Sequence, residues 1–165
     1  MSKSNISYRT VKESDREFLF RLFESTRDDI RKHATKLSYV EQTELIRMQF
    51  QAQDKHYKKF YPDAEFLIIK SRNKDIGRLY IEEWPSQIRI IDITIDPKFR
   101  GKGLGGQIMA DIIRKSESKG KATSIHVAKD NRALNLYNRL GFEIDGGTEV
   151  YHLMVRPANS QMEVS

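Results

Sequence analysis

A glycine-rich turn between a predicted strand and a predicted helix constrains this chain more than any other feature. The turn, residues 100–106, reads Arg-Gly-Lys-Gly-Leu-Gly-Gly, and it joins the apolar run 88–95 to the amphipathic stretch 104–119. Glycines let the main chain approach a ligand closely. The start of a helix offers unpaired N–H groups and the positive end of the helix dipole. This order of strand, turn and helix predicts a backbone site for a pyrophosphate.

The composition excludes several other kinds of chemistry. The chain has 165 residues, which suits one domain, and no cysteine, so disulfides, thiolate metal sites and a cysteine nucleophile are ruled out. His33, His56 and His126 show no metal-ligand spacing, and no Gly-x-Ser-x-Gly motif presents a serine nucleophile. We therefore expect no metal.

Hydropathy and charge suggest where such a chain works. No apolar run is long enough to cross a membrane, and no apolar signal region stands at the N-terminus. We expect a soluble, cytoplasmic protein with one domain over 1–165, ordered from about 6 to 155, and a polar tail over 157–165. The net charge of +6 suits an anionic ligand or nucleic acid, although 23 acidic and 29 basic residues are interspersed as on an ordinary surface.

The N-terminal region predicts one strand and one helix. The alternating segment 6–9 predicts the strand. Ser14 to Glu17 has the pattern of a capping box, which predicts a helix running to about Ser25. The segment 26–37 is charged and aperiodic, and we expect it to be irregular.

A second capping-box pattern, Ser38 to Glu41, predicts another helix. Pro62 disfavours helix in the residue before it and ends the segment. Three residues at helical spacing are expected on its core stripe: Leu45, Met48 and Ala52.

The rest of the chain predicts strands that cluster before the glycine turn and alternate with helices after it. The expected ranges are strands 66–69, 76–84 and 87–95, helix 104–119, strand 123–127, helix 131–140, and one or two strands within 143–155. Gly120 and Gly141 suit the left-handed positions that end two of these helices. The first three strands fit an antiparallel meander. The fold class is therefore α/β, of the mixed-sheet (α+β) type, with helices on both faces.

Two phosphate-binding motifs fit the glycine turn poorly. Gly101-x-Gly103-x-x-Gly106 matches the dinucleotide pattern, but that site normally opens a run of parallel βαβ units and needs an acidic residue after the next strand, for which Asp130 is the candidate. The nucleoside-triphosphate P-loop requires a Lys-Ser/Thr pair, which is missing here.

A wider pattern explains more residues. Arg100-x-x-Gly103-x-Gly105 follows Ile-Thr-Ile-Asp-Pro at 93–97, and a second motif at 131–142 reads Asn-x-Ala-Leu-x-Leu-Tyr-x-x-Leu-Gly-Phe. Together the two motifs resemble the GNAT superfamily of acetyl-CoA-dependent N-acetyltransferases, and the resemblance extends over about 6–155. It implies a six- to seven-stranded, mostly antiparallel sheet with a parallel central pair, flanked by about four helices.

The resemblance also implies which residues bind the cosubstrate acetyl-CoA. In this family the glycine loop holds the pyrophosphate of coenzyme A, and the strand before the loop splays from its neighbour to pair with the pantetheine arm. Asn131 stands one position after the polar residue of many relatives and would equally cap its helix. Two of the implied residues have a structural alternative to a cofactor contact. The Lys102 side chain could simply be solvated, and Gly106 could allow close helix packing. The implied cofactor-binding residues are Ile93, Thr94, Ile95, Arg100, Gly101, Lys102, Gly103, Leu104, Gly105, Gly106, Asn131, Ala133 and Tyr137.

Tyr137 matches the family tyrosine that protonates the departing thiolate. A phenol is still protonated at neutral pH and is therefore able to donate. Outside the motif, Tyr137 would read as a core residue packed beside Leu136 and Leu140. The motifs do not fix the base that takes a proton from the amine, and three candidates stay open beside their purely structural roles: His126, Asp92 and Glu83.

In this family the first two helices and their connection build most of the acceptor site, here about residues 20–61. We expect aromatic residues to line it: Tyr39, Tyr57, Tyr80 and Trp84. The implied reaction transfers an acetyl group from acetyl-CoA to a primary amine of a small molecule, peptide or protein. Direct attack in a ternary complex suits a chain without cysteine, and a monomer or a homodimer is expected.

Two other functions remain open. One is a GNAT-fold module that binds acyl-CoA without turnover. The other is a basic RNA- or protein-binding module, suggested by the basic and aromatic residues that alternate over 54–61. The acetyltransferase hypothesis itself involves neither a membrane nor nucleic acid.

Overall fold

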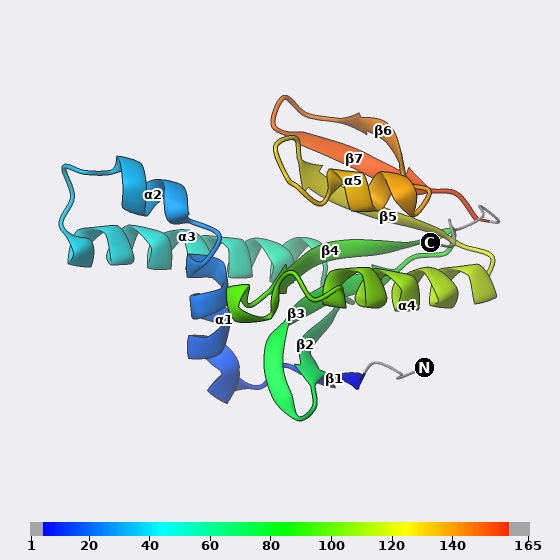
Figure 1. The fold of residues 1–165 in the computed structure, drawn as a ribbon, viewed down its shortest axis with the longest axis horizontal. Helices are drawn as coiled ribbons and strands as arrows, with labels where there is room; N and C mark the ends of the chain where they lie inside the picture. The colour runs from blue at the N-terminus through cyan, green and yellow to red at the C-terminus, as the bar shows by residue number, and fades with distance from the viewer. Residues whose placement is uncertain (1–4, 159–165) are drawn as a thin grey trace.

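A seven-stranded sheet forms the centre of the protein in the computed structural model, which describes residues 5–158 (Figure 1). The strands are β1 (Ile6–Thr10), β2 (Glu65–Ser71), β3 (Lys74–Glu83), β4 (Gln87–Ile95), β5 (Ala122–Ala128), β6 (Glu143–Gly147) and β7 (Tyr151–Arg156). The helices are α1 (Arg16–Glu24), α2 (Asp28–His33), α3 (Tyr39–Phe60), α4 (Leu104–Ser118) and α5 (Leu134–Arg139), with single 3₁₀ turns η1 (Glu13–Asp15) and η2 (Pro97–Phe99).

The strand order is β1-β2-β3-β4-β5-β7-β6. Within the described residues β4 and β5 are parallel, and the other neighbouring pairs are antiparallel. A parallel pair needs a long crossover, which α4 supplies here. The expected mixed sheet with a parallel pair and an antiparallel meander is thus confirmed, and the glycine turn stands at the crossover.

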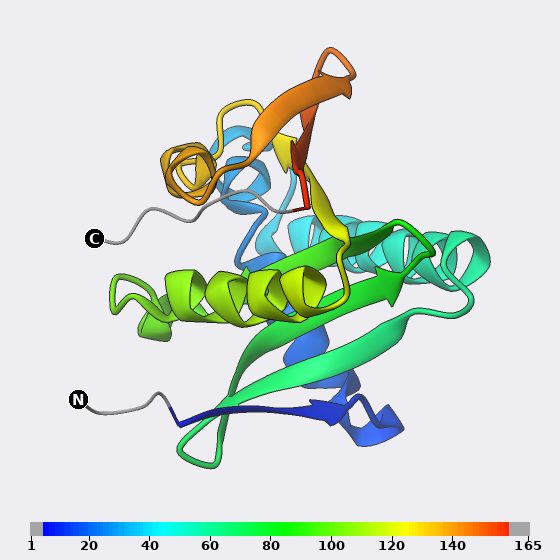
Figure 2. The ribbon, with the colours of Figure 1, turned by 90° about the vertical axis from the view of Figure 1, so that its right-hand side faces the viewer.

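Helices cover both faces of the sheet: α4 and α5 lie on one face, and α1 and α3 lie on the other (Figure 2). In β2, Ile69 belongs to the core beneath α4, which includes Ile108. The adjacent Ile68 belongs to the second core, with Phe20 and Phe50 of α1 and α3. Because successive side chains of a strand point to opposite faces, one continuous apolar run serves two cores.

The second predicted helix is confirmed, but its predicted core stripe is wrong. Ser38 Oγ accepts from the Glu41 N–H (3.1 Å), and the Glu41 carboxylate accepts from the Ser38 N–H (2.8 Å), so the capping box holds. Met48, however, is 66% exposed. The buried stripe includes polar Gln42, whose amide donates to the Ala34 carbonyl (3.0 Å), and this bond makes its burial tolerable. The buried residues of α3 are Gln42, Ile46 and Phe50.

The segment 26–37, predicted to be irregular, contains the helix α2 and corrects that prediction. Its first turn is acidic and its last turn is basic, an arrangement that complements the helix dipole. Arg31 fixes α2 to its neighbours, since it pairs with Glu24 (2.6 Å), donates to Thr43 (2.9 Å) and stacks over the Tyr39 ring (3.9 Å). Because charged contacts rather than a stripe of apolar residues hold α2 in place, its sequence shows no helical periodicity of apolar residues.

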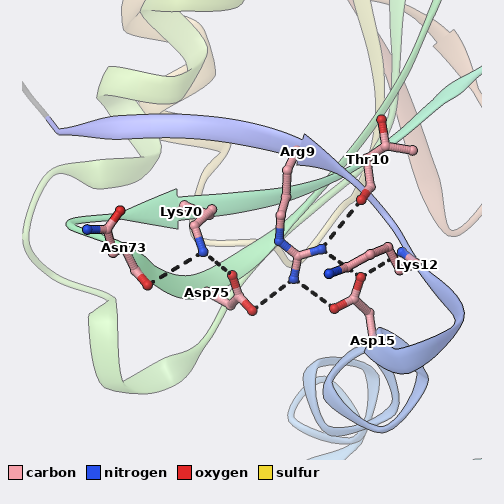
Figure 3. A network of polar contacts seen from close by, with 7 residues as sticks. All are labelled: Arg9, Thr10, Lys12, Asp15, Lys70, Asn73 and Asp75. Carbon is pink, nitrogen blue, oxygen red and sulfur yellow. Dashed lines mark hydrogen bonds and ion pairs between the residues drawn. The ribbon is translucent and has the colours of Figure 1, made fainter.

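A polar network replaces the capping box predicted at Ser14 (Figure 3). The Asp15 carboxylate accepts from the Lys12 N–H (2.7 Å) and from Arg9 (2.7 and 2.8 Å), and Arg9 lowers the pKa of Asp15 to about 2. Arg9 also pairs with Asp75 (2.9 Å) at the start of β3. This network joins β1, η1 and β3, so the cap belongs to the 3₁₀ turn ahead of α1.

The polar tail expected over 157–165 falls largely outside the described residues, since residues 159–165 are not described. Within 5–158, no helix is both long enough and apolar enough to cross a membrane.

Gly77 is required by a close contact between β3 and β4. A Cβ at this position would lie 2.4 Å from the main-chain oxygen of Thr94. We predict that Gly77→Ala lowers the free energy of unfolding by about 1–3 kcal/mol, because the backbone of β4 must shift to accommodate the methyl group. Urea denaturation measures the loss. In the matched control Gly106→Ala the new Cβ lies 3.9 Å from Leu136 Cδ1, and the change should stay within about 1 kcal/mol. Equal stability of the two variants would contradict this account.

Candidate functional site

The parallel pair β4–β5 separates half-way along its length. Its register runs from Gln87 opposite Ala122 to Ile90 opposite Ile125 and then stops, although β4 continues to Ile95. The strands β5 to β7 turn away from β4 with α5 (Figures 1 and 2). Beyond Ile90, therefore, β4 presents a free edge inside the sheet.

A β-bulge marks the place where the strands separate. Tyr80 of β3 pairs with Asp92 and Ile81 pairs with Ile90, so Ile91 has no partner on β3. Bulges bend a strand and increase its twist, which turns the end of β4 away from β5.

Along β4 the main-chain groups of successive residues point alternately toward β3 and toward the gap that opens where β5 separates from β4. Asp96 donates its N–H to Ile76 of β3 (2.7 Å), so the amides of alternate residues, including Thr94, also point toward β3. Those of Ile93 and Ile95 point toward the gap. The Ile95 carbonyl already accepts from Arg100 Nε (2.9 Å).

The glycine turn joins this edge to the start of α4. Gly101 and Gly103 both have φ of +77°, and nothing lies within 4 Å of a Cβ built on either of them. As first-turn residues of α4, Leu104, Gly105 and Gly106 have N–H groups without acceptors inside the helix. Left-handed glycines, open space and three unpaired N–H groups fit a diphosphate.

A cavity of about 560 Å³ lies along this edge between β4, α4 and α5. Of the predicted cofactor-binding residues, nine line it: Ile93, Thr94, Ile95, Arg100, Gly101, Gly105, Asn131, Ala133 and Tyr137. Lys102, Gly103, Leu104 and Gly106 do not line it. Lys102 Nζ lies 5.6 Å from the centre of the Phe99 ring. Asn131 Oδ1 accepts from the Ala133 N–H (2.8 Å), so this residue caps the turn before α5 and also faces the cavity.

A second cavity of about 650 Å³ lies on the α3 side of the sheet. Its walls come from α1, α3, β3, β4, β5 and the β6–β7 hairpin. The two cavities share five lining residues: Thr26, Ile93, Thr94, Asn131 and Tyr137. They therefore meet at the gap between β4 and β5.

Tyr137 stands at this junction. It is 5% exposed, its ring packs 5.8 Å from that of Phe142, and its hydroxyl has no hydrogen-bond partner among the described residues. Burial, and then the charge of Asp92, raises the pKa of Tyr137 to about 12. At neutral pH the phenol is protonated and able to donate.

Asp92 is held by three donors inside the 650 Å³ cavity. Its carboxylate accepts from Arg78 (2.7 Å), from the Tyr57 hydroxyl (2.8 Å) and from the Thr94 hydroxyl (2.8 Å). Arg78 also donates to Gln53 (2.7 Å), and its Nε is buried without a partner among the described residues. Asp92 is thus part of a partly buried network in which three donors already occupy its carboxylate.

The other candidate bases differ in position. His126 lines the 650 Å³ cavity, with Nδ1 3.4 Å from Arg89 Nη1, and burial and then the charge of Arg89 lower its pKa. Both effects favour the neutral imidazole. Glu83 lines neither cavity; it pairs with Lys119 (2.8 Å) and Lys121 (2.6 Å), which lower its pKa to about 2.

One of the four predicted acceptor-site aromatics lines the 650 Å³ cavity, namely Tyr57. Tyr80 is 3% exposed and packs edge-on against Tyr57 at 5.8 Å, behind the cavity wall. Trp84 stacks against Arg89 at 4.7 Å, and Tyr39 is 70% exposed beside Arg31.

Sequence reasoning missed the arginines of the 650 Å³ cavity, which are Arg27, Arg78 and Arg89. Arg78 and Arg89 stand within strand segments, where the sequence suggests that a basic residue faces solvent. Only the pairing of the strands and the gap between β4 and β5 place these side chains in a cavity. One available signal was a charged residue inside an otherwise apolar strand, as at Arg89. In the described part of the chain, no group of three or more His, Asp or Glu side chains is able to hold a metal ion.

The comparisons with solved structures show the same fold. PaiA N-acetyltransferase from Thermoplasma acidophilum, in complex with coenzyme A, is 16% identical with a TM-score of 0.66, over 95% of this chain and 99% of that one. A GNAT family acetyltransferase from Elizabethkingia anophelis with acetyl-CoA bound is 18% identical (TM-score 0.61; 94% and 99%). RimL, a ribosomal L7/L12 alpha-N-protein acetyltransferase, is 17% identical (TM-score 0.63; 94% and 91%).

Sequence comparison agrees with the geometry. The family model described as an acetyltransferase (GNAT) domain matches residues 62–144, half of the chain. The match contains the whole of β3, β4, α4, β5 and α5, the elements that build the gap, the glycine turn and the Tyr137 junction. The chain belongs to the GNAT acetyltransferase family.

Proposed function

We propose that this protein is a single-domain N-acetyltransferase that moves the acetyl group of acetyl-CoA to a primary amine by direct attack in a ternary complex. The observation that carries the proposal is the junction of the two cavities at Tyr137. One cavity adjoins the glycine turn and the free edge of β4, and the other has the volume and polar lining of an acceptor site. A thioester in the first and an amine in the second would meet beside a buried phenol.

Main-chain groups supply most of the proposed cosubstrate site. The amides at the start of α4 are available to the diphosphate, and the outward-facing N–H groups of Ile93 and Ile95 and the Ile93 carbonyl are available to an extended amide-bearing arm. Pairing of that arm with β4 would continue the sheet across the gap as a missing strand would.

The proposed chemistry needs one base and one acid. His126, in its neutral form, takes the proton of the ammonium so that the free amine attacks the thioester carbonyl. As the C–S bond breaks, the Tyr137 hydroxyl gives its proton to the departing thiolate. The attacking nitrogen loses its second proton to solvent as it becomes an amide nitrogen, and solvent reprotonates Tyr137. Asp92 is the next candidate base, although three donors already occupy its carboxylate. Glu83 is the weakest of the three because two lysines stabilise its charged form and it lies outside both cavities.

The comparisons leave the class of acceptor amine open. One of them is a protein acetyltransferase by name, so peptide amines belong in the assay beside small amines. Two rival functions predict other outcomes: a non-catalytic module binds coenzyme A but releases no thiol with any amine, and a basic RNA-binding module binds RNA in a strongly salt-dependent manner and ignores coenzyme A.

A substitution at Gly103 tests whether the glycine turn binds a negatively charged diphosphate. Gly103 has φ of +77° and open space around it. Asp and Asn both tolerate a left-handed backbone and have nearly the same shape, so they differ chiefly in charge. We predict that Gly103→Asp weakens the binding of acetyl-CoA about ten-fold more than Gly103→Asn, roughly 1.4 kcal/mol, and that the difference shrinks in high salt. Calorimetry measures both dissociation constants. Equal affinities would place the diphosphate elsewhere.

The acid role is tested by removing one oxygen atom. Tyr137→Phe should lower kcat about 100-fold or more, the usual contribution of a general acid, with the affinity for acetyl-CoA nearly unchanged. Thiol release over a panel of amines gives the rate, and the wild-type panel tests the proposed function itself. Tyr8→Phe, which removes a hydroxyl outside both cavities, serves as the control. An unaltered rate in Tyr137→Phe would remove this residue from the chemistry.

The base role predicts a pH dependence. His126 must be deprotonated, and its pKa lies below the ordinary value of 6.5, so its effect appears on the acid side. For an acceptor amine with a pKa near ~10, log kcat/KM should rise with a slope of about 1 below the His126 pKa and level off above it, because the bound ammonium then gives its proton to the neutral imidazole. In His126→Asn the slope should be about 1 throughout. A slope unaffected by this substitution would assign the base elsewhere.

A further inference from the structure

The charge of the 650 Å³ cavity is unbalanced. Its lining includes three arginines against a single carboxylate, that of Asp92. Arg78 is paired with Asp92 at 2.7 Å, so these two charges compensate each other. The excess positive charge comes from Arg27 and Arg89.

Arg89 is a buried guanidinium without a carboxylate partner among residues 5–158. It is 9% exposed, its Nε donates to Ser124 Oγ (2.8 Å), and its Nη1 lies 3.4 Å from His126 Nδ1. Its flat face lies 4.7 Å from the Trp84 ring. These contacts fix the side chain but bring no negative charge, and Nη2 has no protein acceptor in the described residues.

Arg27 has a similar position on the opposite wall. It is half-buried, its Nε donates to Gln49 (3.0 Å), and it stacks over the Phe23 ring at 4.3 Å. No ion pair joins it to a carboxylate of the described chain. Two fixed cations thus face one cavity from the sheet and from the helical side.

Burying a charge without a counter-charge is unfavourable, and buried arginines are usually paired. A guanidinium recognises carboxylates and phosphates through paired N–H donors. We infer that the acceptor amine of this enzyme carries an acidic group, a carboxylate or a phosphate, which Arg89 binds from the floor of the cavity. Arg27 adds to the same positive field. Polycationic amines are disfavoured by it.

This inference rests on the proposed function and narrows its acceptor class. The test uses acceptors of equal length: the 3- to 6-carbon ω-amino acids, their carboxamides, the matching diamines, and aminoalkyl phosphates. Thiol release gives kcat/KM for each. We expect an ω-amino acid or an aminoalkyl phosphate to exceed its neutral counterpart by about ten-fold or more, and the diamine to be slowest. The best chain length and the better of the two acidic groups identify the acceptor chemistry.

Arg89→Gln should reduce the acid-to-amide ratio toward one, whereas Arg89→Lys should keep part of it. Because each ratio compares two acceptors in one variant, a changed protonation of His126 affects both and cancels. Arg27→Gln should lower the ratio by a smaller factor. Arg114→Gln, which removes a charge that is 64% exposed on α4, should leave it as in the wild type.

Binding separates this inference from the enzyme assignment. Calorimetry with pentanoate and pentanamide, in the presence of coenzyme A, should favour the acid in the wild type and lose that preference in Arg89→Gln, whether or not any amine is turned over. Failure of every amine while this preference persists would refute the transferase and retain the anion site. Equal binding and equal rates for acid and amide, faster diamines, or a ratio that survives Arg89→Gln would overturn the inference.

Discussion

The interruption of main-chain pairing between β4 and β5 is the constraint on which the site depends. A sheet normally satisfies its strands from both sides, yet β4 loses its β5 partner after Ile90. The bulge at Ile91 turns the strand at that point, and Gly77 lets β3 stay close to the part that follows. The sheet therefore contains an opening with unpaired backbone groups on one side and Tyr137 on the other.

The two ends of this opening differ in the groups that carry positive charge. Around the glycine turn, main-chain N–H groups and left-handed glycines suit a diphosphate, with Arg100 beside them. In the 650 Å³ cavity, by contrast, side chains carry the charge: Asp92 is paired with Arg78, whereas Arg89 is held by Ser124 and has no carboxylate partner among the described residues. One end thus suits a constant cosubstrate and the other a specific acceptor, which agrees with the family motifs clustering in the first.

Much of the fold could be predicted from the sequence because the periodic spacing of apolar residues and the turn residues determine local structure without distant contacts. The strands of the meander, the Ser38 cap and the Gly141 stop needed no distant contact. The face of α3, the helix α2 and the cap at Asp15 were mispredicted because each depends on polar contacts between segments far apart, such as Gln42 with Ala34 and Arg9 with Asp75. The arginine-lined cavity escaped prediction for the same reason, since Arg27, Arg78 and Arg89 come from the α1–α2 connection, β3 and β4 and line one cavity only in the folded chain.

The most direct test of the account is a crystal structure of the protein grown with coenzyme A. We predict the diphosphate within hydrogen-bond distance of the main-chain N–H groups of residues 104–106. The pantetheine arm should lie along Ile93 and Ile95 in the gap between β4 and β5, with its thiol end directed toward Tyr137. Coenzyme A bound elsewhere, or a gap closed by extended β4–β5 pairing, would contradict the central claim.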